Sequence, residues 1–574
     1  MKNAILPLLA TLSGFGLAAQ GPTTTLGQLT TNSTDERWTA CASGDSLTAF
    51  WTGVGLLTTR SADGGDSWTT PSVLATSGFD PSVATRNTSV FLAYASGNPT
   101  SSSIYLTESQ DRGLTFGTPI QVNASTAIAP RQTPKVAVTS NATLVLWKQG
   151  SSLLLNRLVG GAPLASDIVI ASNLQNGFLD FSLSAVDVTS SGPARTVALV
   201  SWRSNAQVWA SASSNAESSS PTFAAIALST PGNPRFPSSK VVLGATGLPE
   251  FYAVWSEFNS ATVLSSFANT EPPTWSTPSS VAQNATNPWL VLTGSSGSQP
   301  KAVVAYEAND EVHARSGAAA GGVIAFGAAL PLSLPAGTGS NYQSDDPQLI
   351  ASGSTVLACW RTEFAGTRTV YVSRSNDGGS TWLAPSDARS MTGSVRGALS
   401  EALNRDYFVT LQTLAATQLG PNAHLFWMPS GLSLPEFRST QIFGTRLYGT
   451  PQGVTLPLVT PGAGHGATLG STIASETMVS TAGSYAMLWF LGTGRGPLDL
   501  SFIENCSGLI GNISSYYYSE GDISSLGSPA QFSTPIPSST SFLGSQHSIT
   551  AIVLNGAPSG CALDSANGMD ITVY

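Results

Sequence analysis

The fold of this chain is decided by the segment Ser375-Asn376-Asp377-Gly378-Gly379-Ser380-Thr381-Trp382. Two copies of it occur at residues 61–68 and 109–116, and all three share the pattern Ser-x-Asp-x-Gly-x-Thr/Ser-aromatic. An Asp can accept hydrogen bonds from the N–H groups of its own turn, a Gly tolerates positive φ, and the closing aromatic can fold back onto a sheet. The pattern therefore predicts structural hairpin corners that repeat along the chain.

A calcium-binding loop is the alternative interpretation of such Asp- and Gly-rich segments. None of the three contains a D-x-D-x-D-G series with a following Glu, which a calcium loop would need. The four histidines are scattered without the spacing of metal ligands: His313, His424, His465 and His547. We therefore predict neither a metal site nor a cofactor.

The spacing of the copies predicts further units between them. The first two begin 48 residues apart, and the third begins 266 residues after the second, so degenerate corners should lie between. Short apolar, β-rich runs that end in an aromatic recur at intervals of 43 to 55 residues. These aromatics are Trp51, Tyr94, Trp147, Trp202, Trp255, Tyr306 and Trp360. One further period falls on residues 407–411, a candidate for an eighth member.

Proline gives a third periodic marker. Pro81, Pro134 and Pro347 each precede their aromatic by 13 residues, and Pro237 and Pro288 by 18, so we expect each to open a strand. Four antiparallel strands in each unit of about 50 residues indicate an all-β fold, a β-propeller. Eight blades over about residues 33–450 are favoured, with seven or six as alternatives. An open solenoid would leave strand edges exposed, whereas a closed ring hides them.

The three corners resemble the Asp box of the sialidase-like (BNR) propeller superfamily. The resemblance implies that the boxes are structural and lie on the face opposite the active site. The box residues are Asp63, Gly65, Trp68, Asp111, Gly113, Phe116, Asp377, Gly379 and Trp382. It also implies glycans as ligands, and a catalytic site that uses arginines and a Tyr nucleophile assisted by a Glu.

Three parts of the chain differ in sequence character. Residues 1–20 read as a secretion signal peptide, with a charged start, an uncharged apolar stretch and small residues near Ala19. Residues 21–454 hold the repeats of the propeller. The period fails in residues 455–574, where alternating strands predict a C-terminal β-sandwich module. We therefore expect a secreted or otherwise extracytoplasmic protein, in the periplasm or on the cell surface, without a membrane span.

Only 10% of the residues are charged, and the formal net charge is −9. Nucleic acid is excluded as an expected partner, because phosphate binding needs a basic stripe. Attachment to a membrane surface through basic patches is excluded for the same reason. We expect a monomer that binds glycans or glycoconjugates.

The four cysteines fall into two pairs. Cys506 and Cys561 both lie in the C-terminal module, and we predict that they form a disulfide, as an exported chain allows. The closed loop would contribute about 4 kcal/mol in the chain-entropy model. Cys41 and Cys359 fall in expected core strands. Two alternatives stay open for them, free buried thiols and a second disulfide.

The topology predicts where chemistry could occur. In a four-stranded meander the boxes lie at one end, and the loops after the second strand and before the first strand lie at the other. These loops collect many charged side chains, although loops gather charge in any protein. After the second strands come Lys148, Arg203, Glu257, Glu307, Asp310, Glu311, Arg361 and Glu363, and before the first strands come Asp80, Arg131, Arg235, Asp345 and Asp346.

From this set we select catalytic and substrate-binding candidates, because arginines and carboxylates suit an anionic or hydroxyl-rich ligand. The catalytic candidates are Asp80, Glu257, Tyr342, Arg203 and Arg361. The substrate-binding candidates are Arg131, Arg235, Glu307, Glu363 and Asp346. The resemblance implies that Tyr342 would be the nucleophile, and that Arg203 and Arg361 occupy positions of the family's arginines.

The sequence departs from the sialidase pattern at the entry to the first blade. The family carries a Phe/Tyr-Arg-Ile-Pro motif there, whereas this chain has Asp35-Glu36-Arg37-Trp38-Thr39. Three functions therefore stay open. The first is an exported sialidase-like propeller that recognises or hydrolyses glycans. The second is a non-catalytic carbohydrate-binding or adhesion protein, and the third is a structural component of the envelope.

Overall fold

The computed structural model describes most of residues 38–382. The described residues are 23–28, 38–43, 46–62, 65, 67–98, 100–125, 131–172, 174, 181–189, 193–204, 206–294, 299–333, 342–364, 367–375 and 377–382, and beyond them the backbone of the later strands. This part of the chain is all-β, and none of it is a helix that could span a membrane. The predicted signal peptide of residues 1–20 lies outside it.

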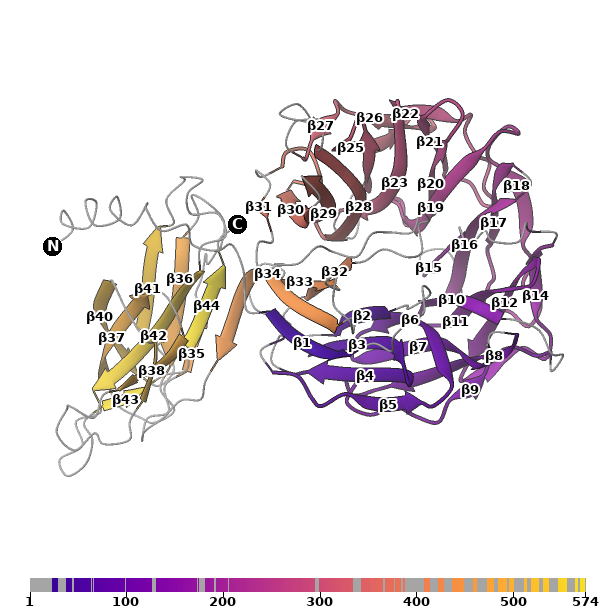
Figure 1. The fold of residues 1–574 in the computed structure, drawn as a ribbon. Coiled ribbons are helices and arrows are strands. Elements are labelled where there is room, and N and C mark those ends of the chain that lie inside the picture. The colour runs from indigo at the N-terminus through magenta and orange to yellow at the C-terminus, as the bar shows by residue number, and fades with distance from the viewer. Residues whose placement is uncertain are drawn as a thin grey trace.

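Seven consecutive antiparallel sheets make up the described propeller, and we number them in chain order (Figure 1). Sheet 1 holds β2 (Trp38–Ser43), β3 (Ser46–Gly53), β4 (Gly55–Ser61) and β5 (Ser72–Ala75). Sheet 2 holds β6 (Gly78–Arg86), β7 (Ser89–Asn98), β8 (Ser101–Ser109) and β9 (Ile120–Gln121). Sheet 3 holds β10 (Arg131–Val138), β11 (Thr143–Gln149), β12 (Ser152–Val159), β13 (Ala162–Pro163) and β14 (Ile168–Ala171). Sheet 4 holds β15 (Phe181–Val188), β16 (Arg195–Ser204), β17 (Gln207–Ser213) and β18 (Ala224–Ala227).

The remaining three repeat the same order. Sheet 5 holds β19 (Pro234–Leu243), β20 (Pro249–Glu257), β21 (Thr262–Ala268) and β22 (Ser279–Gln283). Sheet 6 holds β23 (Ala285–Thr293), β24 (Lys301–Ala308), β25 (Glu311–Ala320), β26 (Val323–Phe326) and β27 (Leu330–Pro331). Sheet 7 holds β28 (Tyr342–Ser352), β29 (Thr355–Phe364), β30 (Thr367–Ser375) and β31 (Ser386–Asp387). The four-stranded antiparallel unit predicted from the repeats is confirmed.

The two ends of the propeller meet in one more group of strands. β32 (Tyr407–Gln412), β33 (Asn422–Trp427) and β34 (Glu436–Tyr448) pair in order, and β1 (Thr23–Gln28) pairs with β34. We call these four strands the closing sheet. The first strands of successive sheets contact one another from β2 to β28, and β32 contacts both β28 and β2. The innermost strands therefore form a closed ring around a central axis (Figure 1).

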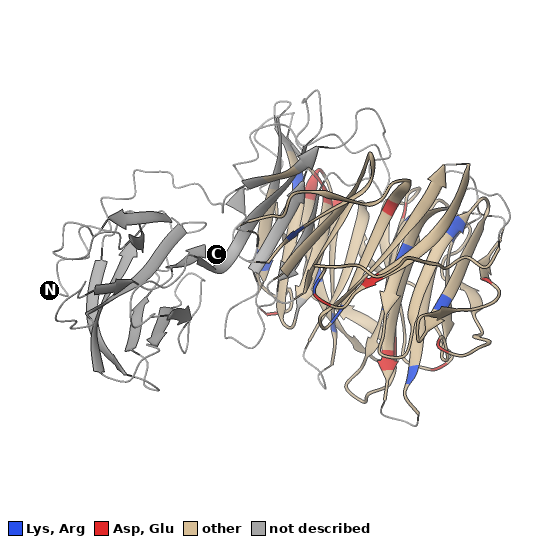
Figure 2. Ribbon diagram, turned by 90° about the horizontal axis from the view of Figure 1, so that it is seen from below, with Lys and Arg blue, Asp and Glu red and all other residues tan. Residues whose placement is uncertain are grey.

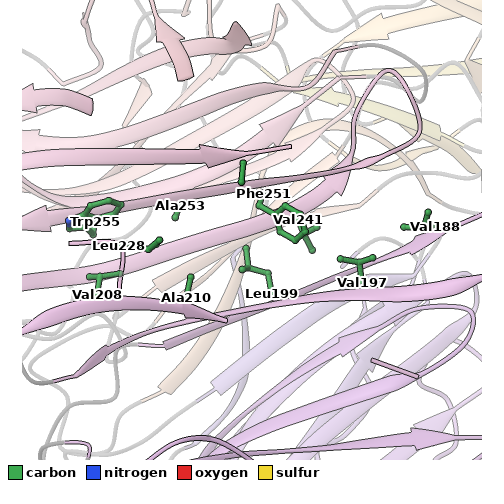
Figure 3. Packing of buried hydrophobic residues seen from close by; sticks show 11 residues of the cluster. Val188, Val197, Leu199, Val208, Ala210, Leu228, Val241, Phe251, Ala253 and Trp255 are labelled. Atoms are coloured by element: carbon green, nitrogen blue, oxygen red, sulfur yellow. The ribbon is translucent and has the colours of Figure 1, made fainter. Parts of the chain in front are cut away.

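The predicted aromatic markers all lie in the second strands of sheets 1 to 7. Each side chain packs against the preceding sheet, and so the core consists of clusters between neighbouring sheets. Figure 3 shows one such cluster, in which Trp255 and Phe251 of sheet 5 meet Leu199 and Val208 of sheet 4. Side chains alternate between the two faces of a strand, so the residue that follows each aromatic faces the next sheet.

The run projected from the period as an eighth member does not lie in a second strand. Residues 407–411 lie in β32, which is the first strand of the closing sheet. The second strand of this sheet is β33, which ends at Trp427. The projection fails because the interval after Trp360 is longer than the intervals before it.

The predicted corners connect the third and fourth strands. In the third corner, Ser375 Oγ accepts the N–H of Gly379 at 2.8 Å, and the Asp377 carboxylate accepts the N–H and hydroxyl of Thr381 at 2.9 and 2.6 Å. The second corner repeats these bonds. Burial opposes ionisation of Asp111 there, but hydrogen bonds from Thr115 and Ser109 outweigh it and lower its pKa to about 2.

Each corner also packs against a neighbouring sheet. Phe116 meets Phe50 of sheet 1 edge to face at 5.7 Å, and Trp68 and Trp382 pack on core clusters. Asp63 lies outside the described residues, while Gly65 donates its N–H to Ser61 Oγ at 2.6 Å. A degenerate corner occurs in sheet 4, where Ser213 Oγ donates to Asn215 in the position of the box Asp.

The marker prolines lie inside the first strands and not at their first residues. Register shifts occur at each of them, between the residues 79/82, 132/135, 235/238, 286/289 and 345/348. A proline has no N–H to donate to the neighbouring strand. The extra residue of a β-bulge is left unpaired, so a proline there breaks no hydrogen bond of the sheet. The first strand is also the inner edge of its sheet, where a missing donor is tolerated.

The C-terminal part continues from β34. Residues 444–448 of β34 pair with β44 (Gly568–Thr572), in a sheet that also holds β42 (Gln546–Leu554), β37 (Ser484–Gly492), β40 (Tyr518–Ser525) and β43 (Leu563–Ser565). A second sheet holds β35 (Leu458–Pro461), β36 (Thr472–Met478) and β41 (Ala530–Pro535), and β38 (Arg495–Asp499) pairs with β39 (Ile510–Ile513). The sandwich and its boundary at residue 455 stay predictions.

The cysteines can be placed in part. Cys41 in β2 and Cys359 in β29 are buried thiols of the propeller core, and burial raises the pKa of Cys41 to about 12. Cys506 and Cys561 lie outside the described residues, so their disulfide stays a prediction.

Candidate functional site

Five bulges line the end of the ring opposite the corners. At each bulge the residue before the proline is not glycine and has φ between 52° and 54°. These residues are Asp80, Thr133, Phe236, Asn287 and Asp346. Such backbone costs free energy, and residues of this kind cluster where a protein binds or reacts. We call this end of the ring the mouth. Charged residues are few along the described ribbon as a whole, and they occur at both of its ends (Figure 2).

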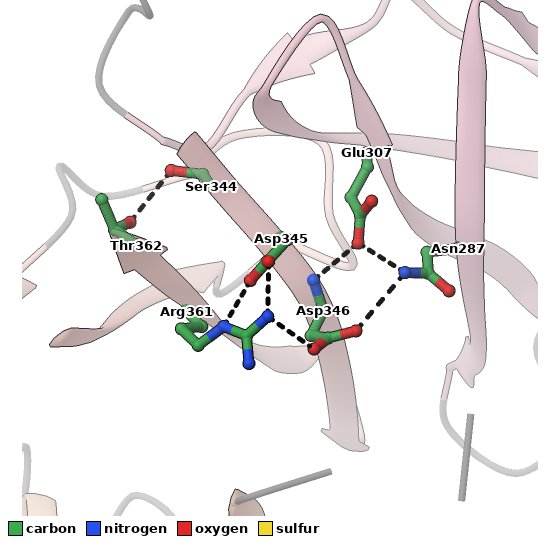
Figure 4. A network of polar contacts seen from close by, with 7 residues as sticks. All are labelled: Asn287, Glu307, Ser344, Asp345, Asp346, Arg361 and Thr362. Atoms are coloured by element: carbon green, nitrogen blue, oxygen red, sulfur yellow. Dashed lines mark hydrogen bonds and ion pairs between the residues drawn. The ribbon is translucent and has the colours of Figure 1, made fainter. Parts of the chain in front are cut away.

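Two of these bulges share a polar network at the junction of sheets 6 and 7. Glu307 Oε1 accepts Asn287 Nδ2 at 2.6 Å and the backbone N–H of Asp346 at 2.6 Å (Figure 4). Asn287 Nδ2 also contacts Asp346 Oδ1 at 3.4 Å. Arg361 donates two hydrogen bonds to Asp345, at 2.7 and 2.5 Å, and pairs with Asp346 Oδ2 at 3.3 Å. We call these five residues the Glu307 network.

The network follows from the strand geometry. Glu307 comes directly after the marker Tyr306, so it faces sheet 7, where the bulge presents the Asp346 N–H. Arg361 follows Trp360 and lies opposite Asp345 in the ladder. The side chains of Asp345 and Asp346 keep 20% and 17% exposure, so the network is reachable from solvent.

Glu307 is the titratable group of this network. Burial is the main cause that raises its pKa to about 7, and the neighbouring Asp346 carboxylate adds to the rise. Its Oε2 makes no hydrogen bond to the described residues, since both of its contacts use Oε1. Glu307 can therefore give or take a proton near neutral pH, with one oxygen available to a ligand.

Further predicted residues lie around the bulge of sheet 5, on both faces of that sheet. The buried Arg203 donates from Nη2 to Asn233 Oδ1 at 2.8 Å. The guanidinium of Arg235 lies over the ring of Phe258, with Cζ 4.8 Å from the centroid. Glu257 accepts Trp255 Nε1 at 3.1 Å, and burial raises its pKa. Arg203 and Glu257 thus lie between sheets 4 and 5, whereas Arg235, which pairs with Ser256 in the ladder, lies with Phe258 on the face of sheet 5 toward sheet 6.

The other predicted residues are placed less completely. Asp80 is buried, and its Oδ2 accepts the N–H of Thr133 at 3.0 Å, which ties sheet 2 to sheet 3. Arg131, Tyr342 and Glu363 lie in β10, β28 and β29, but their side chains are outside the described residues. Lys148 directly follows the marker Trp147 in β11 and is buried, and its burial lowers its pKa.

The structure thus brings together two sets of the predicted residues. Glu307, Asp346 and Arg361 meet at the junction of sheets 6 and 7. Arg203 and Glu257 lie between sheets 4 and 5, and Arg235 lies on the other face of sheet 5. Sequence reasoning missed Asn287, Asn233 and Phe258. A signal for Asn287 exists, because Asn and Asp tolerate positive φ and both Asn287 and Asp346 directly precede a marker proline.

No group of three or more His, Cys, Asp or Glu side chains able to hold a metal ion occurs among the described residues. No protein-family model and no curated protein matches the chain. Several solved structures are similar to it at low identity. One is a post-proline cleaving enzyme from Rickettsia typhi, with 10% identity, 68% of this chain and 58% of that chain covered, and a TM-score of 0.35.

Two others are similar over different spans. A fungal alcohol oxidase of the AA5 family, in complex with copper, is 8% identical and covers 97% of this chain and 100% of its own, with a TM-score of 0.39. A fucose-specific lectin from Aleuria aurantia is 11% identical and covers 55% of this chain and 91% of its own, with a TM-score of 0.30. The propeller architecture of this chain rests on its own sheet topology.

Proposed function

We propose that this protein is an exported, monomeric, eight-bladed propeller that binds glycans at its mouth. The observation that supports the proposal is the Glu307 network, in which strained bulges hold donors and acceptors together at a solvent-reachable junction. A sugar hydroxyl both donates and accepts hydrogen bonds, so it needs partners of both kinds. Carboxylate oxygens and a guanidinium in one rigid group provide them.

Glycoside hydrolysis at the same junction is the second candidate, and the raised pKa of Glu307 favours it. Hydrolysis needs two carboxyl groups with different protonation. Glu307 would be the proton donor, and Asp346, which pairs with Arg361, would be the second carboxylate. Both carboxyl groups contact the same Asn287 nitrogen, so they are close enough to act on one glycosidic bond.

Sialidase-type hydrolysis is a narrower form of this second candidate. It would use Tyr342 as nucleophile with Arg203 and Arg361 on the substrate. Arg203 and Arg361 belong to different junctions, and Arg361 already pairs with two carboxylates. Binding without hydrolysis therefore ranks first.

A glycan array probed with the full chain tests the first proposal. We expect binding to at least one glycan class, weakened about tenfold by Asp346→Ala, which removes an acceptor and an Arg361 partner. Glu108→Ala, at the end that carries the corners, is the matched control and should bind normally. Absence of binding to every glycan would refute the proposal.

A panel of aryl glycosides, sialosides included, separates hydrolysis from binding. If hydrolysis occurs at this junction, Glu307→Gln should abolish reporter release and retain binding, because glutamine keeps the shape but not the titratable proton. No release by the unaltered protein would leave binding as the function.

A further inference from the structure

We infer that a cavity between sheets 2 and 3, at the end of the ring that carries the corners, binds a small zwitterion. The ligand class is a free amino acid or short peptide, whose carboxylate binds Arg86 and whose ammonium group binds Glu108. The cavity has a volume of about 520 Å³. Sites for small molecules typically measure roughly 300–1,000 Å³. The inference is independent of the proposed glycan binding, because the mouth lies at the other end of the ring.

The walls of the cavity come from two neighbouring sheets. Phe91 of β7 and Leu106 of β8 belong to sheet 2, and Leu158 of β12 belongs to sheet 3. All three side chains are buried and form an apolar floor. At the rim, a Cβ added to Gly160 or Gly161 would meet no atom within 4 Å, so the cavity is open on this side. A ligand with an apolar side chain could therefore enter and cover the floor.

Arg86 provides the positive charge of the cavity. Its guanidinium lies over the ring of Phe91, with Cζ 5.6 Å from the centroid, and its Nη1 donates to the carbonyl of Thr139 in the turn after β10. These two contacts hold the guanidinium in one place. Its other N–H groups make no hydrogen bond to the described residues, so they stay available for the oxygens of a carboxylate.

Glu108 provides the negative charge. It lies opposite Phe91 in the ladder of β7 and β8, so its side chain is on the face of sheet 2 toward sheet 3. It is half-buried, and its carboxylate makes neither a hydrogen bond nor an ion pair with the described residues. Arg86 and Glu108 therefore line one cavity without pairing with each other. A ligand with a single charge would meet a like charge there, whereas a zwitterion complements both.

The turn of residues 140–143 forms a further side of the cavity, and it is held in place by sheet 4. The Ser140 N–H and Asn141 Nδ2 donate to the two carboxylate oxygens of Asp187, at 2.6 and 3.0 Å. These bonds also occupy the Asp187 carboxylate, which leaves Glu108 to bind the ligand's ammonium group. Because the turn is fixed before a ligand binds, little conformational entropy is lost on binding.

Calorimetric titration of the full chain with four ligands tests the inference. Leucine and leucyl-leucine are zwitterions, leucinamide lacks the carboxylate, and N-acetyl-leucine lacks the ammonium group. We expect a zwitterion to bind at least about tenfold more tightly than either derivative, and this preference to weaken as salt is added. Tighter binding of leucine or of leucyl-leucine would support the inference and define the length of the ligand. Equal binding of all four would show an apolar cavity only and would overturn it.

Substitutions at the two charges test the residues separately. Arg86→Gln should remove the preference for leucine over leucinamide and keep the preference over N-acetyl-leucine, and Glu108→Gln should do the reverse. Arg86→Lys keeps the charge but not the planar fork, so it should retain part of the preference and also serves if Arg86→Gln does not fold. Arg157→Gln is the matched control. Arg157 also donates to a backbone carbonyl, that of Ser218 at 2.9 Å, but it does not line the cavity.

The outcomes separate this inference from the proposed function. Unchanged preferences in the Arg86 and Glu108 variants would show that the ligand binds elsewhere and would overturn the inference. Absence of binding of both leucine and leucyl-leucine to the unaltered protein would also overturn it, whatever the glycan array shows. Failure to bind any glycan would refute the proposed function and leave this inference standing.

Discussion

Asp346 donates its backbone N–H to Glu307 Oε1 at 2.6 Å across the junction of sheets 6 and 7. Thr133 donates in the same way to Asp80 Oδ2 at 3.0 Å across the junction of sheets 2 and 3. In both cases a bulge residue with positive φ turns its N–H toward a carboxylate of the preceding sheet. The bulges thus join neighbouring sheets at the mouth as well as shaping it.

The Glu307 contact predicts a pH dependence of stability. Its folded pKa of about 7 exceeds the ordinary value of 4.5, so the folded protein holds the proton more tightly than the unfolded chain. The resulting stability is complete below pH 4.5 and is lost as the pH rises through 7. Relative to Glu307→Gln, the unaltered protein should lose on the order of 2 kcal/mol over this window, allowing for partial exposure.

Urea unfolding at a series of pH values measures this difference. Glu108→Gln, remote from the junction, provides the control and should track the unaltered protein. Parallel pH profiles for Glu307→Gln and the unaltered protein would contradict the prediction.

The second corner predicts a large effect at Gly113. A Cβ there would lie 2.3 Å from Oγ1 of the buried Thr48, at a φ of +82°. Gly113→Ala should therefore destabilise by roughly 3 kcal/mol or more, from backbone strain and overpacking together. Gly150→Ala isolates the strain, because φ is +57° and nothing lies within 4 Å, and should cost about 1 kcal/mol. If chemical denaturation showed that Gly113→Ala and Gly150→Ala lower the unfolding free energy equally, the close packing of the corner would be disproved.

The third corner predicts that Ser375 stabilises the propeller. The buried Ser375 Oγ accepts the N–H of Gly379 and donates to Asp377, so Ser375→Ala leaves a buried donor unsatisfied. We expect a loss of about 1–3 kcal/mol in unfolding free energy. Ser380→Ala in the same corner should change it little, because Ser380 is exposed. A smaller loss for Ser375→Ala than for Ser380→Ala would show that the hydroxyl of Ser375 is dispensable.

The closing sheet predicts a role for Leu26. This residue of β1 is 4% exposed and packs with Ala49 and Trp51 of sheet 1. Leu26→Ala should lower the unfolding free energy by about 2–4 kcal/mol. Val54→Ala, at a residue 70% exposed, should stay within about 0.5 kcal/mol of the unaltered protein. A Leu26→Ala variant as stable as the Val54→Ala variant would mean that β1 does not close the ring.

Thiol counting tests the predicted disulfide. If Cys506 and Cys561 are joined, the unfolded and unreduced protein should show two reactive thiols, those of Cys41 and Cys359. Reduction should raise the number to four. The native protein should react slowly, because both propeller thiols are buried. Four thiols before reduction would refute the disulfide.

The four-stranded units of the propeller could be predicted from the sequence repeats. The marker aromatics lie in the second strands because each fills the gap to the preceding sheet, a demand that recurs once in every unit. Strand order also placed the corners at one end of the sheets and the loops selected for their charge at the other, although charged residues such as Arg60, Glu108 and Arg195 lie at the corner end too. The prolines were misplaced within their strands, because a bulge is an irregularity that periodicity does not encode.

The site could be predicted only in part. Charge singled out Glu307, Asp346 and Arg361, but not Asn287, whose amide bridges two of them. Phe258 resembles any other aromatic in the sequence, and only its exposure beside Arg235 distinguishes it. Which side chains of two neighbouring sheets come into contact depends on the angle at which the sheets pack. These contacts therefore cannot be derived from the order of residues alone.

β34 has a mechanical consequence for the molecule. One half of this strand pairs with β33 and β1, and the other half pairs with β44 near the C-terminus. A pulling force on the C-terminal sheet would therefore be transmitted through β34 itself to the closing sheet of the ring. Removal of β1 or of β44 would leave part of one edge of β34 without a partner strand. Strands near both ends of the chain therefore protect the same strand of the closing sheet.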